Sequence, residues 1–344
     1  MKRLLMTATA ALIALGFGGH NAAAEGNLFI YNWTDYTSPD LITKFQQETG
    51  IKVTLDTYDS NETLLAKLQA GGGGYDIVVP THNFVPVLIQ EGLIQKINAS
   101  ELDGYENVDD RWKSPEWDPG NAYTIPWQWG TTAFTVDTAV YGGDINTYKV
   151  MFEPPAELHG SIGMFRAPDE VIPMAQIYLG LPLCNESAEE MKQVLDLLLA
   201  QKPLVKVYNS DGILERLVSG DTALHQNWNG YSMRARKEKP SLQYAYPKEG
   251  IMTWFDNIAV PSSAQNYDNV VKFVSFMMQP ENAAIQSNFA GYSNGIAGST
   301  EFMDAELKDS PEINAPADVE TIFTKTCSEK AIQLSDRVWT RLLQ

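Results

Sequence analysis

Strands and helices alternate along the first part of this chain, and that order constrains the fold more than any other feature of the sequence. Short apolar or alternating runs typical of strands occur at Leu28–Tyr31, Ile51–Leu55 and Asp76–Val79. Between them lie two segments with the pattern of helices, Pro39–Thr49 and Ser60–Ala70. A β-α-β-α-β order predicts a mostly parallel sheet covered by helices, which is the α/β class.

Matching end signals support the first of these helices, because Ser38 precedes it as an N-cap and Gly50 follows its last residue. The aromatic stretch 123–130 is expected to carry the chain into a second α/β unit. In that unit we expect helices and strands at Ser187–Leu199, Ser210–Val218, Thr222–Gln226, Ile258–Pro261, Asn266–Met278 and Pro280–Phe289.

Residues 1–24 read as a secretory signal peptide. Lys2 and Arg3 are followed by a mostly apolar stretch, Met6–Phe17, and then by an A-x-A cleavage site at Ala22–Ala24. The apolar stretch is too short to span a bilayer as a helix. We therefore expect an exported protein whose mature chain, by its length, forms two domains.

The formal charge of −18 argues against nucleic acids and anionic membrane surfaces as partners. It is compatible with cationic ligands, but solubility is the more ordinary explanation of such a charge. The chain has two cysteines, Cys184 and Cys327, which an oxidising compartment would allow to pair. Their separation in space does not follow from the sequence, so the disulfide stays open at this point.

Aromatic and carboxylate residues gather just past short strands or in loops at four places. These places are Trp33–Tyr36, Thr81–Asn83, Trp228–Tyr231 and Trp254–Asp256. Ligands of open α/β sheets bind outside the carboxyl ends of the strands. A desolvated ammonium needs a carboxylate to offset its dehydration and gains cation–π attraction from ring faces. The four clusters therefore indicate a pocket for a small amine.

Nearly the whole mature chain resembles the bacterial periplasmic polyamine-binding proteins, the putrescine/spermidine receptors of ABC importers. The matching stretches are Tyr31–Tyr36, Phe45–Val53, Asp59–Glu62, Tyr75–Thr81, Ala167–Val171, Pro247–Gly250, Trp254–Asp256 and Pro316–Val319. The resemblance implies a periplasmic monomer that binds a small amine or amino acid and delivers it to an ABC permease, without a cofactor.

The resemblance also implies the two-lobed periplasmic binding protein fold of type II, in which two discontinuous α/β domains are joined by hinge strands. Residues 25–130 with 257–300 would form the N-terminal lobe, and residues 131–256 with 301–344 the C-terminal lobe. The ligand would lie in the cleft between them. On the matching positions, the first lobe would line the cleft with Trp33, Thr34, Asp35, Tyr36 and Thr81. The second lobe and the hinge would add Glu170, Trp228, Trp254 and Asp256, and Tyr292 would close one end.

Two positions depart from the family pattern and bear on the ligand. Putrescine receptors carry an acid three residues after the cleft tryptophan, where this chain has Tyr231, and often an acid just before Ala-Pro, where it has Arg166. Arg166 and Tyr231 would suit a carboxylate, and Asp256 with the rings would hold an ammonium. This favours an ω-amino acid such as 4-aminobutyrate over putrescine or spermidine. Alternatively, Arg166 points outward or pairs with an acid of the next turn.

Other classes of function fit less well. Gly291–Gly295 matches the G-x-S-x-G motif of hydrolases, but no histidine follows Ser293 and the segment before it reads as a helix. The histidines that survive cleavage have no metal-ligand spacing, so we expect neither an enzyme nor a metal site. A receptor that presents its ligand to a membrane sensor would have a similar sequence.

Overall fold

A computed structural model describes residues 26–344, and the predicted signal peptide lies outside the described residues. The strands are β1 (Asn27–Trp33), β2 (Lys52–Tyr58), β3 (Ile77–Val78), β4 (Ile94–Gln95), β5 (Thr124–Asp137), β6 (Ile162–Met164), β7 (Val205–Tyr208), β8 (Leu224–Trp228), β9 (Leu242–Tyr244), β10 (Ile251–Pro261), β11 (Ser293–Asn294) and β12 (Thr321–Phe323). The α-helices are α1 (Pro39–Thr49), α2 (Asn61–Gln69), α3 (Val85–Gln90), α4 (Lys149–Phe152), α5 (Pro168–Leu179), α6 (Ala188–Gln201), α7 (Ile213–Ser219), α8 (Asn229–Glu238), α9 (Tyr267–Met277), α10 (Pro280–Ala290), α11 (Ala305–Lys308) and α12 (Glu329–Leu343).

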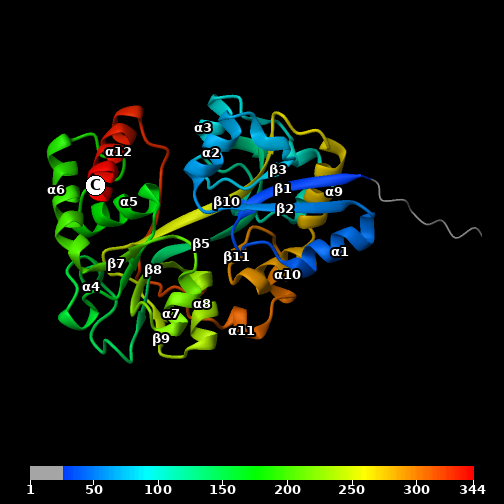
Figure 1. Ribbon diagram of the computed structural model, residues 1–344. Helices are drawn as coiled ribbons and strands as arrows, with labels where there is room; N and C mark the ends of the chain where they lie inside the picture. The colour runs from blue at the N-terminus through cyan, green and yellow to red at the C-terminus, as the bar shows by residue number, and fades with distance from the viewer. Residues whose placement is uncertain (1–25) are drawn as a thin grey trace, which may run out of the picture.

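Two groups of parallel strands meet at a long antiparallel pair. The main order is β2-β1-β3-β10-β5-β8-β6-β7. Strand β1 is parallel to β2 and β3, and β6 is parallel to β7 and β8, whereas β5 and β10 are antiparallel to each other. Figure 1 shows the result as two lobes with β5 and β10 running between them. The predicted α/β class and two-lobed fold are confirmed.

The two long strands belong to both lobes because each pairs with different neighbours along its length. The start of β10 pairs with β12, and its end pairs with β3 and β4. The far end of β5 pairs with β8 and β9 of the second lobe. We propose that the lobes divide along these strands, with 25–130 and 257–300 in the first lobe and 131–256 and 301–344 in the second.

Helix α1 has the ends that the sequence predicts. The Ser38 side chain accepts a hydrogen bond from the Leu41 backbone N–H, and Gly50 adopts a left-handed conformation with φ of 72°. These contacts satisfy backbone groups that the helix itself leaves unpaired. Leu41 and Phe45 face inward and are buried, so the amphipathic pattern also positions the helix against the sheet.

Most other predicted elements differ in their bounds by a few residues, and two of these differences bear on the site. The helix expected at Ser210–Val218 begins only at Ile213, because Gly212 takes a left-handed conformation with φ of 66° that α-helical backbone excludes. Ser210 and Asp211 are therefore loop residues. The strand expected at Ile258–Pro261 is the last part of β10, whose earlier residues carry the aromatic and polar side chains of the site.

A disulfide joins Cys184 to Cys327 across 143 residues of sequence. It ties the loop between α5 and α6 to the segment that leads into α12, so both ends of the link lie in the second lobe. The pairing that the sequence left open is therefore present. Within residues 26–344, none of the helices combines the length and hydropathy needed to cross a membrane.

Candidate ligand-binding site

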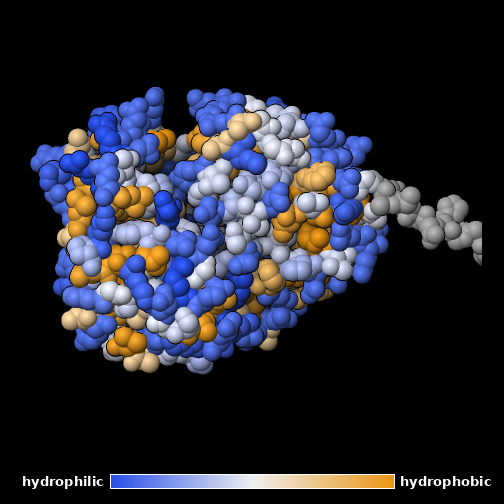
Figure 2. All heavy atoms as spheres, viewed as in Figure 1, coloured by the Kyte–Doolittle hydropathy of each residue, from blue (hydrophilic) through white to orange (hydrophobic). Residues whose placement is uncertain are grey.

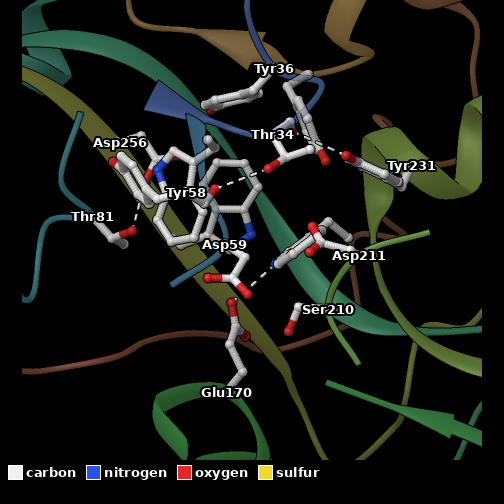
Figure 3. A pocket seen from close by; sticks show the side chains of 14 residues that line it. Thr34, Tyr36, Tyr58, Asp59, Thr81, Glu170, Ser210, Asp211, Tyr231 and Asp256 are labelled. Atoms are coloured by element: carbon white, nitrogen blue, oxygen red, sulfur yellow. Dashed lines mark hydrogen bonds between the residues drawn. The ribbon is translucent and has the colours of Figure 1, made fainter. Parts of the chain in front are cut away.

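A cavity of about 500 Å³, partly open to solvent, lies between the lobes where strands from both of them end. Figure 3 shows its fourteen lining residues, with Asp256 and Thr81 on one side and Asp211 on the other. The lining consists of Trp33, Thr34, Tyr36, Tyr58, Asp59, Thr81, Glu170, Ser210, Asp211, Trp228, Tyr231, Trp254, Asp256 and Tyr292.

Asp256 lies at the inner end of the cavity, at an irregularity in the pairing of β10 with β5. Phe255 pairs with Trp129 and Asn257 pairs with Pro126, so Asp256 stands opposite two residues of β5. Such bulges redirect side chains and are frequent beside functional sites. Asp256 is 4% exposed, and one of its carboxylate oxygens accepts a hydrogen bond of 2.8 Å from the Thr81 hydroxyl.

Burial raises the pKa of the Asp256 carboxyl to about 7, although the hydrogen bond from the Thr81 hydroxyl offsets part of the shift. In the protein without a ligand this carboxyl is hard to ionise. A neighbouring positive charge favours its ionised form, so a cation and the carboxylate form a strong pair. Asn61 holds Thr81 in place, because it donates to the Thr81 hydroxyl and accepts from the Thr81 backbone N–H.

Aromatic rings form the walls of the inner end. The Trp33 indole donates to the Val79 carbonyl at 2.9 Å and packs on Tyr58, with ring centroids 4.8 Å apart. Tyr292 meets Tyr36 and Trp254 edge to face, at centroid distances of 5.5 and 5.1 Å. These rings are fixed by contacts with each other and with the backbone, so the apolar walls are formed before any ligand enters.

The second lobe supplies Trp228 and Glu170 to the middle of the cavity. The Trp228 ring stacks on Phe165 at 4.3 Å, and its indole N–H donates to Glu170 at 3.0 Å. Burial, followed by the nearby Asp169, raises the pKa of the Glu170 carboxyl to about 8. Glu170 lies in the first turn of α5, where the helix dipole favours a negative side chain.

Two further acids line the outer end of the cavity, and neither was expected there from the sequence. Asp59 follows β2 in the first lobe, and Asp211 follows β7 in the second. Asp59 is half-buried and Asp211 is exposed. Partial burial and the facing carboxylates of Asp59 and Asp35 raise the pKa of Asp211. The rule that ligands bind past strand ends would have found both acids if the end of β2 had been predicted correctly and the strand β7 had been predicted at all.

Ten of the twelve residues expected at the site line this cavity, and Asp35 and Arg166 do not. Asp35 is exposed, and its backbone carbonyl, not its carboxylate, makes the cross-lobe contact. Arg166 is exposed too, and the hydrogen bond that fixes it is made by its backbone N–H to Ser210. The prediction that Arg166 holds a ligand carboxylate therefore has no support from the cavity lining, because the chain turns into α5 at this point.

The interlobe cleft continues beyond this cavity. A smaller space of about 270 Å³ shares Thr81, Glu170 and Trp254 with it, and is followed by a wider, open one of about 1150 Å³. Helices α2 and α3 of the first lobe and α5 and α12 of the second line the wider space. Figure 2 shows a hollow in the surface between α12 and α3.

The hydrolase motif lies outside this chemistry. Ser293 is in the short strand β11, which pairs with β5, and His225 contacts Arg216 and the Gln226 carbonyl in the second lobe. Among the residues that the structure describes, no group of three or more histidine, cysteine, aspartate or glutamate side chains is arranged to hold a metal ion.

Comparisons with known proteins agree with this geometry. A model of bacterial extracellular solute-binding proteins matches residues 40–315. A putrescine-binding periplasmic protein of Pseudomonas aeruginosa is 32% identical over 99% of both chains. Another from Escherichia coli is 33% identical over 96% of this chain and 95% of that one. A solved structure from Listeria monocytogenes, assigned to spermidine/putrescine ABC transport, superposes with a TM-score of 0.87 at 29% identity, over 92% of this chain and 99% of that one.

Proposed function

Because this chain belongs to the family of bacterial extracellular solute-binding proteins, we propose that its cleft captures a linear aliphatic diamine, with putrescine as the preferred ligand. The chain is a periplasmic solute-binding protein of an ABC importer and not an enzyme. Such a protein takes up a small solute and works with a permease in the membrane. The choice of ligand is the part that we propose.

One observation carries the proposal: the charged residues that line the cavity are all acids. They are Asp59, Glu170, Asp211 and Asp256, and none of the fourteen lining residues is a lysine, arginine or histidine. Asp256 lies at the inner end, Glu170 in the middle, and Asp59 and Asp211 at the outer end, which suits a ligand with two ammonium groups separated by an alkyl chain. We propose that Asp256 binds one ammonium, that Asp59 and Asp211 attract the other, and that Trp228 covers the chain between them.

An ω-amino acid such as 4-aminobutyrate is the competing ligand. Its main support was Arg166, whose side chain is exposed and outside the cavity lining. Arg216 contacts the backbone carbonyl of Asp211, and a second guanidinium near the cavity is that of Arg234, stacked on Tyr231 at 4.1 Å. A carboxylate at Tyr231 would lie near that cation but would also face the acids of the outer end. A buried or half-buried charge without a partner costs several kcal/mol, and this disfavours the carboxylate.

Calorimetry with putrescine, spermidine, 4-aminobutyrate and 5-aminovalerate tests the ligand. We expect the tightest binding for putrescine, in or below the micromolar range. Spermidine is included because a second, narrower space adjoins the cavity at Glu170. Tight binding of 4-aminobutyrate together with no heat from putrescine would contradict the proposal and restore the ω-amino acid.

A further inference from the structure

One face of helix α8 in the second lobe contacts the first lobe directly. Its first turn lies so close to the end of α10 that a Cβ atom at Gly230 would be 2.5 Å from the Tyr292 ring and 2.6 Å from the Ala290 carbonyl oxygen. At Gly291, where φ is 81°, a Cβ would be 3.0 Å from the Gly230 carbonyl oxygen. Only glycine allows this approach, which brings the next turn of α8 over the first lobe.

Two side chains of that helix make hydrogen bonds across the lobe boundary. The Tyr231 hydroxyl donates to the Thr34 carbonyl at 3.1 Å, and an Arg234 N–H donates to the Asp35 carbonyl at 3.3 Å. Neither acceptor is a side chain, so the contacts depend on the backbone conformation of the turn that follows β1.

Asp35 gives this turn an uncommon conformation, with φ of 52° in the left-handed region. Non-glycine residues adopt this region rarely and at some energetic cost, and such residues concentrate where backbone is held for function. The turn is anchored to its own lobe, since the Thr34 backbone N–H donates to the Tyr58 carbonyl at 3.0 Å. The first lobe thus presents two neighbouring carbonyls to α8.

Arg234 also joins the lobes through ring faces. Its guanidinium carbon lies 4.1 Å from the centroid of the Tyr231 ring and 6.0 Å from that of Phe289, which belongs to α10 of the first lobe. Tyr231 itself is 8% exposed and lines the ligand cavity. The cation therefore fixes the orientation of a cavity wall and connects it to the opposite lobe.

We propose that Tyr231 and Arg234 form an interlobe latch, and that Arg234 is a positioning residue that strengthens ligand binding without touching the ligand. The latch contacts exist only when the lobes meet, so they stabilise the closed state relative to the open one. Any ligand that binds between the lobes then gains affinity in proportion to the closed population. The latch rests on the proposed function in one respect, namely that a ligand closes the cleft. It does not depend on which solute that ligand is.

Pulsed electron paramagnetic resonance between spin labels on the two lobes tests the latch without a ligand. Because Cys184 and Cys327 are joined in a disulfide, cysteines introduced at the exposed positions Gln47 in α1 and Gln193 in α6 are the sites for labelling. We expect Arg234→Ala to shift the ligand-free distance distribution to longer values. The putrescine-saturated distribution should stay at the short distance.

The same variant should bind putrescine about tenfold more weakly, mainly through faster dissociation. Lys237→Ala is the matched control: it removes the same charge from the same helix, but Lys237 pairs with Glu306 outside the cavity. Tyr231→Phe deletes only the hydroxyl and gives a milder test if Arg234→Ala is poorly folded.

Unchanged distances and dissociation rates in both latch variants would overturn the proposal. Absence of putrescine binding to the parent protein contradicts the ligand instead, and the ligand-free distances still decide the latch.

Discussion

The inner and outer ends of the cavity both offer carboxylates to a cation, but in very different surroundings. At the inner end, Asp256 is 4% exposed, accepts a hydrogen bond from Thr81, and has a pKa raised to about 7 by burial. At the outer end, Asp59 is half-buried and Asp211 is exposed, and they belong to different lobes. The inner acid is held by the hinge strands, whereas the outer acids come together only when the lobes meet.

This difference indicates separate roles for similar groups. A buried carboxylate interacts strongly with an ammonium because little water screens the pair, and its own ionisation is costly until the ammonium arrives. An exposed carboxylate attracts cations over a longer range but contributes little to affinity, since water and salt screen it. We expect the inner end to determine affinity and the outer end to determine the rate and salt dependence of capture.

Asp256→Asn should have the largest effect on binding. The variant keeps the shape of the side chain but leaves the inner ammonium without its counter-charge, which costs about 2–5 kcal/mol, or roughly 30- to 4,000-fold in Kd. Calorimetry with putrescine measures the loss. Asp59→Asn is the matched control, because it makes the same substitution at the outer end.

Thermal unfolding separates this effect from damage to the fold. Since burial raises the pKa of Asp256, ionising it at pH 8 costs folding free energy, whereas below about pH 4 the acid is protonated and the cost is absent. Asp256→Asn should therefore raise the Tm at pH 8 and change it little at pH 4. A lowered Tm at pH 8 would mean that the substitution damages the fold, whereas binding within threefold of the parent protein would show that the inner end is not the main anchor.

Proton release should accompany binding, with an effect of intermediate size. In the protein the carboxyls of Asp256 and Glu170 have pKa values of about 7 and 8, and an adjacent ammonium lowers both. Binding near pH 7 then releases protons, and affinity rises with pH in the window below these values. Asp256 alone implies roughly a tenfold tighter Kd at pH 8 than at pH 6.

Calorimetry in two buffers with different ionisation enthalpies measures the number of protons released. Asp256→Asn should release fewer, and the difference gives the share of the inner carboxyl. Equal heats in both buffers at pH 7 would mean that these acids are already ionised before the ligand arrives, and would remove the proposed contrast between the two ends.

The inner end follows from the sequence more readily than the outer one. Trp33, Thr81 and Asp256 stand in recognisable clusters, and helix α1 has end signals that set its bounds. Asp211 was not expected at the site because the apolar pattern predicts a helix that already begins at Ser210. The helix begins only after Gly212, because that residue takes a left-handed conformation. A local pattern does not report that conformation.

Arg166 shows the same limit of sequence-based prediction, but here a residue was expected at the cavity and does not line it. Its charge and its place next to Ala-Pro suggested a ligand contact, but its direction depends on the turn into α5. The pairing of Cys184 with Cys327 likewise depends on α12 returning to the loop between α5 and α6. In each case the missing information is three-dimensional: residue type predicts the chemistry, and the chain path decides which cavity it serves.

The double variant Asp59→Asn/Asp211→Asn should have the smallest effect at equilibrium and the clearest effect on salt dependence. Removing two partly solvated charges should weaken putrescine binding by about tenfold or less, because exposed charge pairs contribute little. The association rate should fall at low ionic strength and converge with that of the parent protein in high salt, where the Debye length is only a few ångströms. Stopped-flow tryptophan fluorescence over a salt series measures both. A loss of affinity as large as that of Asp256→Asn, unchanged by salt, would mean that Asp59 and Asp211 bind the second ammonium as tightly as Asp256 binds the first. The two ends would then be equivalent anchors, and the difference in burial between them would not control affinity.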